Sequence, residues 1–597
     1  MPGNPNKLTR FWQELKRRKV VRVITVYAAA AFVILELVSI IVDPLKLPEW
    51  TLPFMIVLLC VGFIIAVILS WIYDIHPEEG IVKTESIDTV KEVDIPKSSN
   101  SWKTASFFSF VVIVGLVAFN IFGGNRGARI NESLVKSIAV LPFHNFSGDS
   151  GQDYMCEGLT DEIISHLFKV KSFDQVRSLT SVLQYKDTDK STTEIANALS
   201  VNYILEGSFK RIGDKLRITA QLIEPKNDNH IWLQDYDLPY HNVIGIPPEI
   251  ALQIADHLKA FITEEEKQQI EKIPTDNLDA YENYMLGKSQ MYRKENDESL
   301  WRAVEYFQQA VSLDTTYALA YSGLAEVYYH MVHFSILSPK VAFLKAKAYA
   351  LKALSLDDGL ANSHCMLALI KGSFEYDFNG AEKEYKRALE IDPKSFEAHL
   401  YYARFLSTMG KHDKAISHIT NATELDPFST LAGVDRIATL YYAGYKSEAI
   451  EAMEKVIDSY PNNSRGYWFC AVFYTDLERY TEALSIAKLL ISLLGDNNIS
   501  DEVGLQGYLY GKLGQRDKAL EQLDQLDILS SKGYYIDPRT RVWVYLGIDE
   551  IDTAIEILRQ SFEDHIFDPG FLKIYPSEFA QNDPGFIELQ KNIGLIQ

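Results

Sequence analysis

The sequence predicts a multidomain fold: three transmembrane helices, then an α/β domain, then an all-α solenoid of short repeats. Three observations predict it. Three apolar runs of about 20 residues each occur near the amino terminus, and about 20 apolar residues are needed to cross a bilayer. Patterns of strand length and helix length alternate after residue 136. In the carboxyl-terminal half, small residues recur with a period of 34.

Length and charge narrow the class of protein. At roughly 150 residues per domain, a chain of 597 residues must form several domains. It carries 59 basic and 80 acidic residues, for a net charge of −21. This balance excludes a general nucleic-acid binder, because neutralising phosphates needs clustered Lys and Arg. Four cysteines are too few for a disulfide scaffold.

The apolar runs predict a membrane anchor at 23–124, with spans at about 23–42, 53–73 and 105–122. Lys and Arg are concentrated in the tail 1–22 and in the loop between the second and third runs, so the amino terminus is predicted to be cytoplasmic. Three spans would then place the later domains in the periplasm. The predicted localisation is the bacterial inner membrane, with the lipid bilayer as one partner.

Two polar residues fall inside the predicted spans. Glu36 lies in the first predicted span. A charged group inside a bilayer is energetically unfavourable and is often functional. Asn120 is at a comparable depth in the third span, so the two are predicted to pair. A structural role, in which a protonated or hydrogen-bonded Glu36 holds the helices together, is favoured over a proton or ion pathway.

The middle unit, 133–262, reads as an α/β domain. An apolar strand at Ser137–Phe143 is followed by a helix at Asp153–Phe168, a short helix at Thr193–Leu199 and three further strands. These strands are expected at Asn202–Phe209, Leu216–Glu224 and His230–Asp237, with a hairpin turn between the first two of them. The loop 144–152 contains Gly but has no GxxxxGK[ST] motif. The carboxylates of Asp149, Asp153, Glu157 and Asp161 near it indicate helix capping, because they would repel phosphate.

Several separated blocks of this unit resemble a known module. The blocks IAVLPFHNFSGD, YILEGSFKR and RITAQLIE, with HIWLQDYD after them, are similar to the TolB amino-terminal-domain-like module. This module accompanies tetratricopeptide repeats in bacterial membrane proteins, including periplasmic parts of CadC-type regulators and some cyclases. The resemblance implies a non-catalytic periplasmic module. The winged helix and the cyclase domain of those relatives are missing from this sequence.

The repeat unit covers 275–560, with a carboxyl-terminal cap at 561–597. Pro393, Pro427 and Pro461 are 34 residues apart, and so are four alanines: Ala381, Ala415, Ala449 and Ala483. This period, with small residues where paired helices cross, is the signature of tetratricopeptide repeats (TPR). The register predicts about eight repeats, each burying its apolar face against its neighbours.

The first helix of each TPR lines the inner face of the solenoid. Projecting the register onto that face gives a candidate groove for a protein partner, because aromatic residues and Arg are typical interface anchors. The candidate residues are Leu400, Arg404, Tyr441, Tyr442, Arg465, Trp468 and Asp476. The Lys and Asn pattern of carboxylate-clamp repeats is absent, which disfavours capture of a free carboxyl terminus.

The sequence proposes no catalytic, cofactor or metal site. His330 and His333 lie three apart, but two histidines are too few for a zinc site. The predicted function is therefore a non-enzymatic scaffold that binds unidentified proteins in envelope assembly or sensing. The alternative is a transmembrane receptor that relays a periplasmic signal to a cytoplasmic partner. The oligomeric state is left open.

Overall fold

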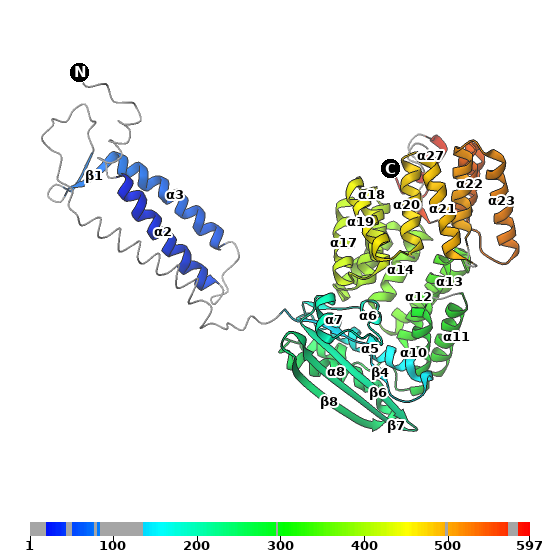
Figure 1. Ribbon diagram of the computed structural model, residues 1–597, viewed down its shortest axis with the longest axis horizontal. Helices are drawn as coiled ribbons and strands as arrows, with labels where there is room; N and C mark the ends of the chain where they lie inside the picture. The colour runs from blue at the N-terminus through cyan, green and yellow to red at the C-terminus, as the bar shows by residue number, and fades with distance from the viewer. Residues whose placement is uncertain are drawn as a thin grey trace, which may run out of the picture. The chain divides into compact units, whose positions relative to one another are not determined.

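The computed structural model describes residues 20–42, 51–76, 80–83, 135–293, 297–461, 463–495, 499–566, 568–570 and 583–596. The chain divides into two compact units, Met1–Glu132 and Ser133–Gln597 (Figure 1).

The amino-terminal unit contains a helix pair and a short hairpin. Helix α2 (Val20–Val42) packs against α3 (Thr51–Ile72). Strand β1 (Tyr73–His76) pairs antiparallel with β2 (Gly80–Lys83).

A glycine allows the two helices of this unit to approach closely. The Tyr27 hydroxyl on α2 donates a hydrogen bond of 2.9 Å to the Leu59 carbonyl on α3. A Cβ on Gly62 would lie 2.4 Å from that hydroxyl oxygen. A Cβ at position 62 would displace the Tyr27 hydroxyl, so this contact depends on glycine at that position.

The prediction of three transmembrane helices is contradicted. The first two predicted spans fall on α2 and α3, and the third lies outside the described residues. In the described part of the chain, no helix has both the length and the apolar character that crossing a bilayer requires. The inner-membrane localisation, the cytoplasmic amino terminus and the bilayer partner rested on those spans and are corrected with them.

The α/β domain is built on a mixed sheet of order β5-β3-β6-β7-β8, with β4 beside β6. Strand β3 runs parallel to β5 and β6, and β6, β7 and β8 form an antiparallel meander. The strands are β3 (Ser137–Val140), β4 (His144–Asn145), β5 (Gln175–Val176), β6 (Tyr203–Ile212), β7 (Lys215–Glu224) and β8 (Asn229–Pro239).

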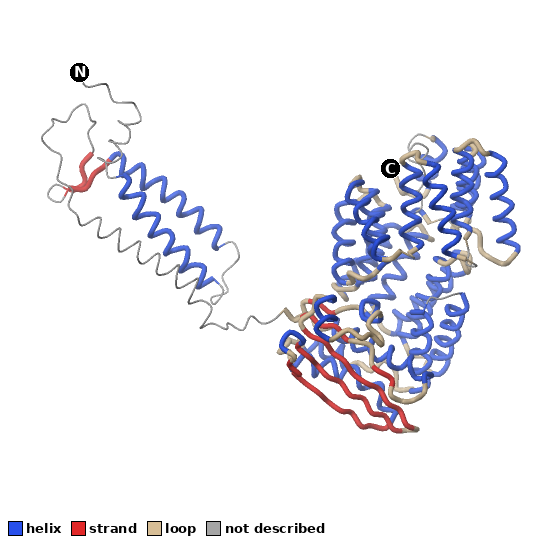
Figure 2. Tube along the Cα trace, in the orientation of Figure 1, coloured by secondary structure: helices blue, strands red, loops and turns tan. Residues whose placement is uncertain are grey.

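The alternation of side chains in the meander explains where the helices pack. In β7, Leu216, Ile218 and Ala220 are buried, whereas Lys215 and Arg217 are exposed, as expected for a strand with one covered face. Figure 2 shows the helices of this domain beside the sheet, with which they form one hydrophobic core. They are α5 (Asp153–Phe168), α6 (Leu179–Leu183), α7 (Thr192–Leu199), α8 (Ile246–His257) and α9 (Glu264–Glu271), with short 3-10 turns η3 (Ser150–Gln152), η4 (Pro225–Asn227) and η5 (Tyr240–Gly245).

The remainder of the second unit is a solenoid of paired helices. The first helices of the pairs are α10 (Leu278–Arg293), α12 (Ala318–His333), α14 (Ala361–Ser373), α16 (Phe396–Thr408), α18 (Thr430–Tyr442), α20 (Ser464–Asp476), α22 (Ser500–Lys512) and α24 (Pro538–Gly547). The second helices are α11 (Asp297–Leu313), α13 (Pro339–Leu356), α15 (Phe378–Ile391), α17 (His412–Leu425), α19 (Lys446–Ser459), α21 (Tyr480–Leu494), α23 (Arg516–Ser531) and α25 (Ile551–Glu563). Helix α27 (Pro584–Asn592) follows them.

Small residues hold each pair together. Ala381, Ala415, Ala449 and Ala483 lie on successive second helices, and each is fully buried. This confirms the expectation that the 34-residue period marks positions where helices cross. Gly410 and Gly444 have positive φ angles of 70° and 91° in the turns between paired helices, a conformation that glycine adopts at little cost.

The α/β domain and the first repeats share one hydrophobic core. Leu159 and Ile163 of α5 belong to the same buried cluster as Tyr281 and Met285 of α10. At Gly158, a Cβ would lie 2.3 Å from the Met285 sulfur, so α5 and α10 pack at close range. The solenoid is therefore built directly onto the α/β domain.

Candidate functional site

The first helices of the repeats form the inner face of the solenoid, and contacts between distant first helices show that the solenoid curls around it. His333 at the end of α12 accepts, through Nε2, a 2.6 Å hydrogen bond from Nη1 of Arg465 on α20. Tyr329 of α12 packs edge-on against Tyr401 of α16, with ring centroids 5.5 Å apart. The inner face is therefore narrow, and its side chains meet across several repeats.

Arg404 is the most strongly held of the predicted groove residues. Its Nε donates to the Asp435 carboxylate at 2.5 Å, and its guanidinium lies 5.3 Å from the Tyr401 ring. Burial opposes the charged form, but the Asp435 carboxylate outweighs it and the pKa of Arg404 is raised. Within the described residues, Nη2 of Arg404 is buried and has no hydrogen-bond partner. Among the described residues, one edge of this guanidinium therefore has no acceptor.

Arg465 lies in the same electrostatic environment. Burial and the neighbouring Arg404 charge lower its pKa, while Asp435 partly restores it. Two guanidinium groups on first helices two repeats apart therefore act on a single hydrogen-bonded carboxylate, that of Asp435.

The aromatic groove residues are engaged in stacking. Trp468 of α20 stacks on Trp543 of α24, with ring centroids 5.2 Å apart. Tyr441 stacks on Phe473 at 3.9 Å and donates a 2.8 Å hydrogen bond to Asp476. The tyrosine stack joins the neighbouring first helices α18 and α20, and the tryptophan stack joins α20 to α24, two repeats further on.

Three predicted groove residues remain to be placed. Asp476 is exposed at the end of α20. The Tyr442 hydroxyl is buried without a hydrogen-bond partner in the described residues. Leu400 is fully buried in the core between the repeats, so it packs the solenoid and does not line the inner face. The predicted pair in the amino-terminal unit, the Glu36 side chain and Asn120, lies outside the described residues.

A segment after α25 also approaches the inner face, which the repeat register did not reveal. The His565 ring hydrogen-bonds the Phe374 carbonyl through Nδ1 at 2.7 Å and stacks on Tyr376 at 5.0 Å. Burial raises the pKa of Asp568, while hydrogen bonds and the charges of Arg539 and Arg404 pull it back down. A carboxylate of the chain itself therefore lies within electrostatic reach of the Arg404 cluster.

The carboxylates in α5 and in the loop before it divide between two roles. Asp149 accepts a hydrogen bond from the Gly151 amide and caps η3, as predicted. Glu157 instead accepts a hydrogen bond of 3.0 Å from Ser289, and Asp161 pairs with Lys288, both on α10. Their main role is thus to join the α/β domain to the first repeat. Sequence reasoning missed this, although their spacing of four places them on one face of α5.

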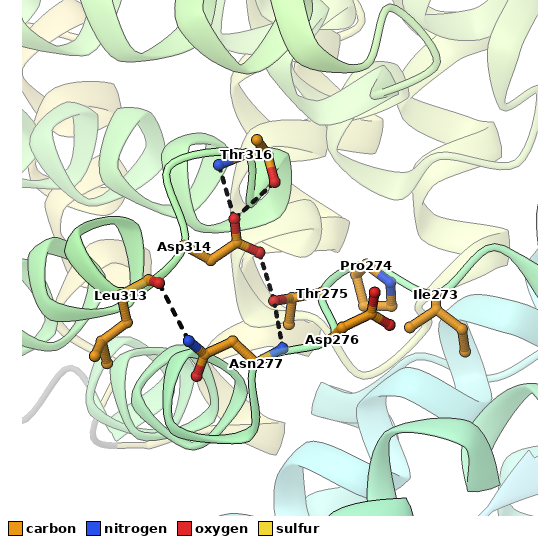
Figure 3. A pocket seen from close by; sticks show the side chains of 8 residues that line it. All are labelled: Ile273, Pro274, Thr275, Asp276, Asn277, Leu313, Asp314 and Thr316. Atoms are coloured by element: carbon orange, nitrogen blue, oxygen red, sulfur yellow. Dashed lines mark hydrogen bonds between the residues drawn. The ribbon is translucent and has the colours of Figure 1, made fainter.

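A shallow cavity of about 650 Å³ lies where α9 leads into α10 (Figure 3). The Asp314 side chain lines this cavity. Both of its carboxylate oxygens accept hydrogen bonds, one from the Thr275 hydroxyl at 2.6 Å and the other from the Thr316 hydroxyl at 2.6 Å. Asn277 donates to the Leu313 carbonyl at 3.1 Å. These bonds fasten the loop to the end of α11.

His330 and three of the cysteines are buried in the fold. His330 is buried and lies 3.7 Å from Glu326. Cys156, Cys365 and Cys470 are buried free thiols. Over the part of the chain that the structure describes, no group of three or more His, Cys, Asp or Glu side chains is arranged to hold a metal ion.

The fold and the inner face define a class: an α/β domain fused to a TPR solenoid. Tetratricopeptide repeat models match residues 375–432 and 435–463. The model of the HilA/YgeH-like transcriptional regulator second domain matches residues 134–245. TPR are thereby confirmed, whereas the TolB-like assignment of the α/β domain stays a prediction.

Among particular proteins, the chain is 30% identical over 189 residues to a Rhizobium meliloti protein named "Putative adenylate cyclase 3", covering 32% of each chain. It is 24% identical over 265 residues to the transcriptional regulator HilA of Salmonella typhimurium, covering 41% of this chain and 46% of HilA. The expected similarity to regulators and cyclases is thus confirmed. The chain spans about a third to a half of the length of these curated relatives.

Two proteins of known structure are less similar to this chain in sequence than these curated relatives are. PilF of Pseudomonas aeruginosa is 19% identical with a TM-score of 0.28, over 39% of this chain and 96% of PilF. Yeast Tom70 is 20% identical with a TM-score of 0.34, over 53% of this chain and 68% of that structure. Similarity at this level places no constraint on function.

Proposed function

We propose that this protein is a non-enzymatic interaction scaffold whose inner face binds an acidic segment of a protein partner. The TPR matches support the general role, because TPR solenoids present extended binding surfaces. The acidic character of the partner is inferred from the arginine cluster.

The observation that carries the proposal is the pair of arginines beside Asp435. Arg404 and Arg465 both act on this one hydrogen-bonded carboxylate, and Nη2 of Arg404 lacks an acceptor among the described residues. A second carboxylate would satisfy that donor, and Arg binds carboxylates with particularly favourable geometry. The aromatic stacks beside it supply rigid surface for the rest of the segment.

Asp568 supports the same chemistry. It lies in a segment that contacts the turn after α14 through His565. Burial raises the pKa of Asp568, and the charges of Arg539 and Arg404 act against that rise. The chain thus already brings an acidic residue of its own toward the cluster. A partner segment would bind by the same attraction and would compete with Asp568.

The α/β domain fits the role of a fixed base for this surface. Its match is to a domain of a regulator rather than to a catalytic domain. The ion pairs and the shared core at α10 keep it in one arrangement with the first repeats. We infer that it positions the solenoid and adds no chemistry.

Site-specific photocrosslinking in the native host tests this function. A benzophenone amino acid replaces Tyr442, which is an aromatic residue on α18, and, as a control, Tyr445, which is 46% exposed in the next turn. We expect a discrete protein adduct from position 442 and a weaker one or none from 445. The adduct at 442 should fall by about tenfold with Arg465→Gln, since a charge-assisted hydrogen bond is worth about 1.5–3 kcal/mol.

Arg465 is the better position to substitute, because removing Arg404 would leave the buried Asp435 carboxylate without its partner. An unchanged melting temperature of Arg465→Gln would show that the fold is kept. An adduct that is equally strong with and without Arg465, or one formed only from position 445, would contradict the proposal.

A further inference from the structure

Helix α13 carries a net positive charge, although the chain as a whole is acidic. Its 18 residues, PKVAFLKAKAYALKALSL, include four lysines and no Asp or Glu, whereas the whole chain has a net charge of −21. Three of the lysines, Lys340, Lys345 and Lys352, are exposed. The fourth, Lys347, forms an ion pair with Glu375.

The same helix exposes a stripe of apolar side chains. Val341 is 47% exposed, Leu344 57% and Leu351 47%, and the exposed Ala348 lies between them. The spacing of three, four and three residues places them on one face of the helix. The opposite face, with Ala342, Ala346, Ala350 and Ala353, is fully buried against the solenoid.

The lysines border this stripe on both sides. At 100° per residue, Lys345 and Lys352 fall beyond one edge of the stripe, next to Val341, and Lys340 falls beyond the other, next to Leu351. Lys345 lies 5.0 Å from the Tyr328 ring and Lys352 lies 5.8 Å from the Tyr321 ring. These rings belong to α12 and orient the two ammonium groups along the edge. No carboxylate pairs with these two lysines in the described part of the chain.

We propose that the outer face of α13 is a docking surface for an acidic amphipathic helix of a partner protein. An apolar stripe on the partner would cover Val341, Leu344 and Leu351. Glu or Asp residues on both sides of that stripe would then meet the flanking lysines, as in helix-to-groove recognition with charged margins.

Charge complementarity decides between the possible occupants. A second copy of this chain placed on the same stripe would bring Lys345 and Lys352 against their own equivalents, and like charges at a margin repel. An acidic helix removes that repulsion and also covers the apolar stripe. This surface lies on a second helix of a repeat, so it is separate from the inner face and its arginine cluster.

Fluorescence anisotropy with the full-length chain tests the proposal. The probe is a labelled helical peptide of the same length as α13, 18 residues, with a Leu stripe flanked by Glu. The counterpart peptide has Lys in place of every Glu. We expect the Glu-flanked peptide to bind at least about tenfold more tightly than the Lys-flanked one.

A charge reversal makes the test specific. In the variant Lys345→Glu/Lys352→Glu, the preference should invert, so that the Lys-flanked peptide binds more tightly. Leu344→Gln should weaken binding of both peptides, and Leu520→Gln on α23, where the leucine is 38% exposed, should change neither. Because all these side chains are exposed, the variants should keep the melting temperature of the parent.

Two results would overturn the proposal. One is a preference for the Glu-flanked peptide that survives the charge reversal. The other is binding of vesicles of phosphatidylglycerol, but not of the Glu-flanked peptide, that depends on the same lysines, since this would assign the surface to anionic lipid. Neither result would bear on Arg465 and the inner face.

Discussion

The Tyr281 hydroxyl on the first solenoid helix donates a 2.6 Å hydrogen bond to the Glu162 carboxylate on α5 of the α/β domain. Both side chains are buried. Together with the Lys288 ion pair to Asp161, this bond places a polar seam inside a shared hydrophobic core. The seam joins the α/β domain to the first repeats by polar contacts within that core.

Removing the Tyr281 hydroxyl should destabilise that structure. Tyr281→Phe leaves the buried Glu162 carboxylate without its donor, which costs about 1–3 kcal/mol in the free energy of unfolding. Urea denaturation followed by circular dichroism measures the change. The control is Tyr445→Phe, at a tyrosine that is 46% exposed. Equal stability of the two variants would show that the bond contributes nothing.

The Glu162 carboxyl should also make stability depend on pH. Burial raises its pKa to about 7 in the folded chain, from an ordinary value of 4.5. Between these values the folded state binds more protons than the unfolded state, so the contribution of Glu162 to stability falls as pH rises from 4.5 to 7. Glu162→Gln should remove that slope and gain roughly 1–3 kcal/mol relative to the parent at pH 7.5, but little at pH 4.5. Parallel stability curves for the two proteins across this range would contradict the assignment.

Two glycines set the closest helix crossing of the later repeats. A Cβ on Gly511 of α22 would lie 2.3 Å from the Gly547 carbonyl oxygen, and one on Gly547 would lie 2.5 Å from the Tyr508 Cα. Backbone atoms cannot move aside as a side chain can. Gly547→Ala should therefore lower the free energy of unfolding by about 1–3 kcal/mol. At Gly245, where a Cβ would meet nothing within 4 Å, Ala should change thermal stability by less than about 0.5 kcal/mol.

A second junction between domain and solenoid lies at Asp426. Its carboxylate accepts hydrogen bonds from Ser178 at 2.8 Å and from Ser181 at 2.5 Å. Asp426→Ala leaves the fully buried Ser181 hydroxyl without the acceptor for its proton, which costs about 1–3 kcal/mol in the free energy of unfolding. Hydrogen exchange should then accelerate in α6 and at the start of α18, but not in α24. Asp524→Ala, at an exposed position on α23, should leave exchange in α6 unchanged.

The sequence pattern predicted those helices and turns that are determined by residues close together in the chain. The helix expected at Asp153–Phe168 has those bounds in the structure. The turn expected between the second and third strands of the α/β domain forms at Gly213, with a φ of 60°. Buried alanines at a period of 34 predicted the paired helices, because only small side chains fit where they cross.

Other features depend on the curvature of the solenoid and on contacts between distant repeats. The 34-residue register of the sequence does not predict either of these. Arg465 meets His333 across several repeats only because small rotations between repeats accumulate. Leu400 was assigned to the inner face by register, but it turns into the core. The predicted transmembrane helices were contradicted, because no helix among the described residues is both long enough and apolar enough to cross a bilayer. The predicted domain boundaries and the groove as a binding site remain proposals.

The most direct test of the inner face uses the chain's own acidic segment as the probe. A labelled peptide with the sequence of residues 563–570, EDHIFDPG, is titrated into the full-length Asp568→Asn variant, so that the intramolecular carboxylate does not compete. We expect this peptide to bind about tenfold more tightly than its counterpart with Asn at the position of Asp568, and Arg465→Gln should abolish the difference. Equal affinities for the two peptides, or a preference that persists without Arg465, would contradict an inner face built to bind acidic segments.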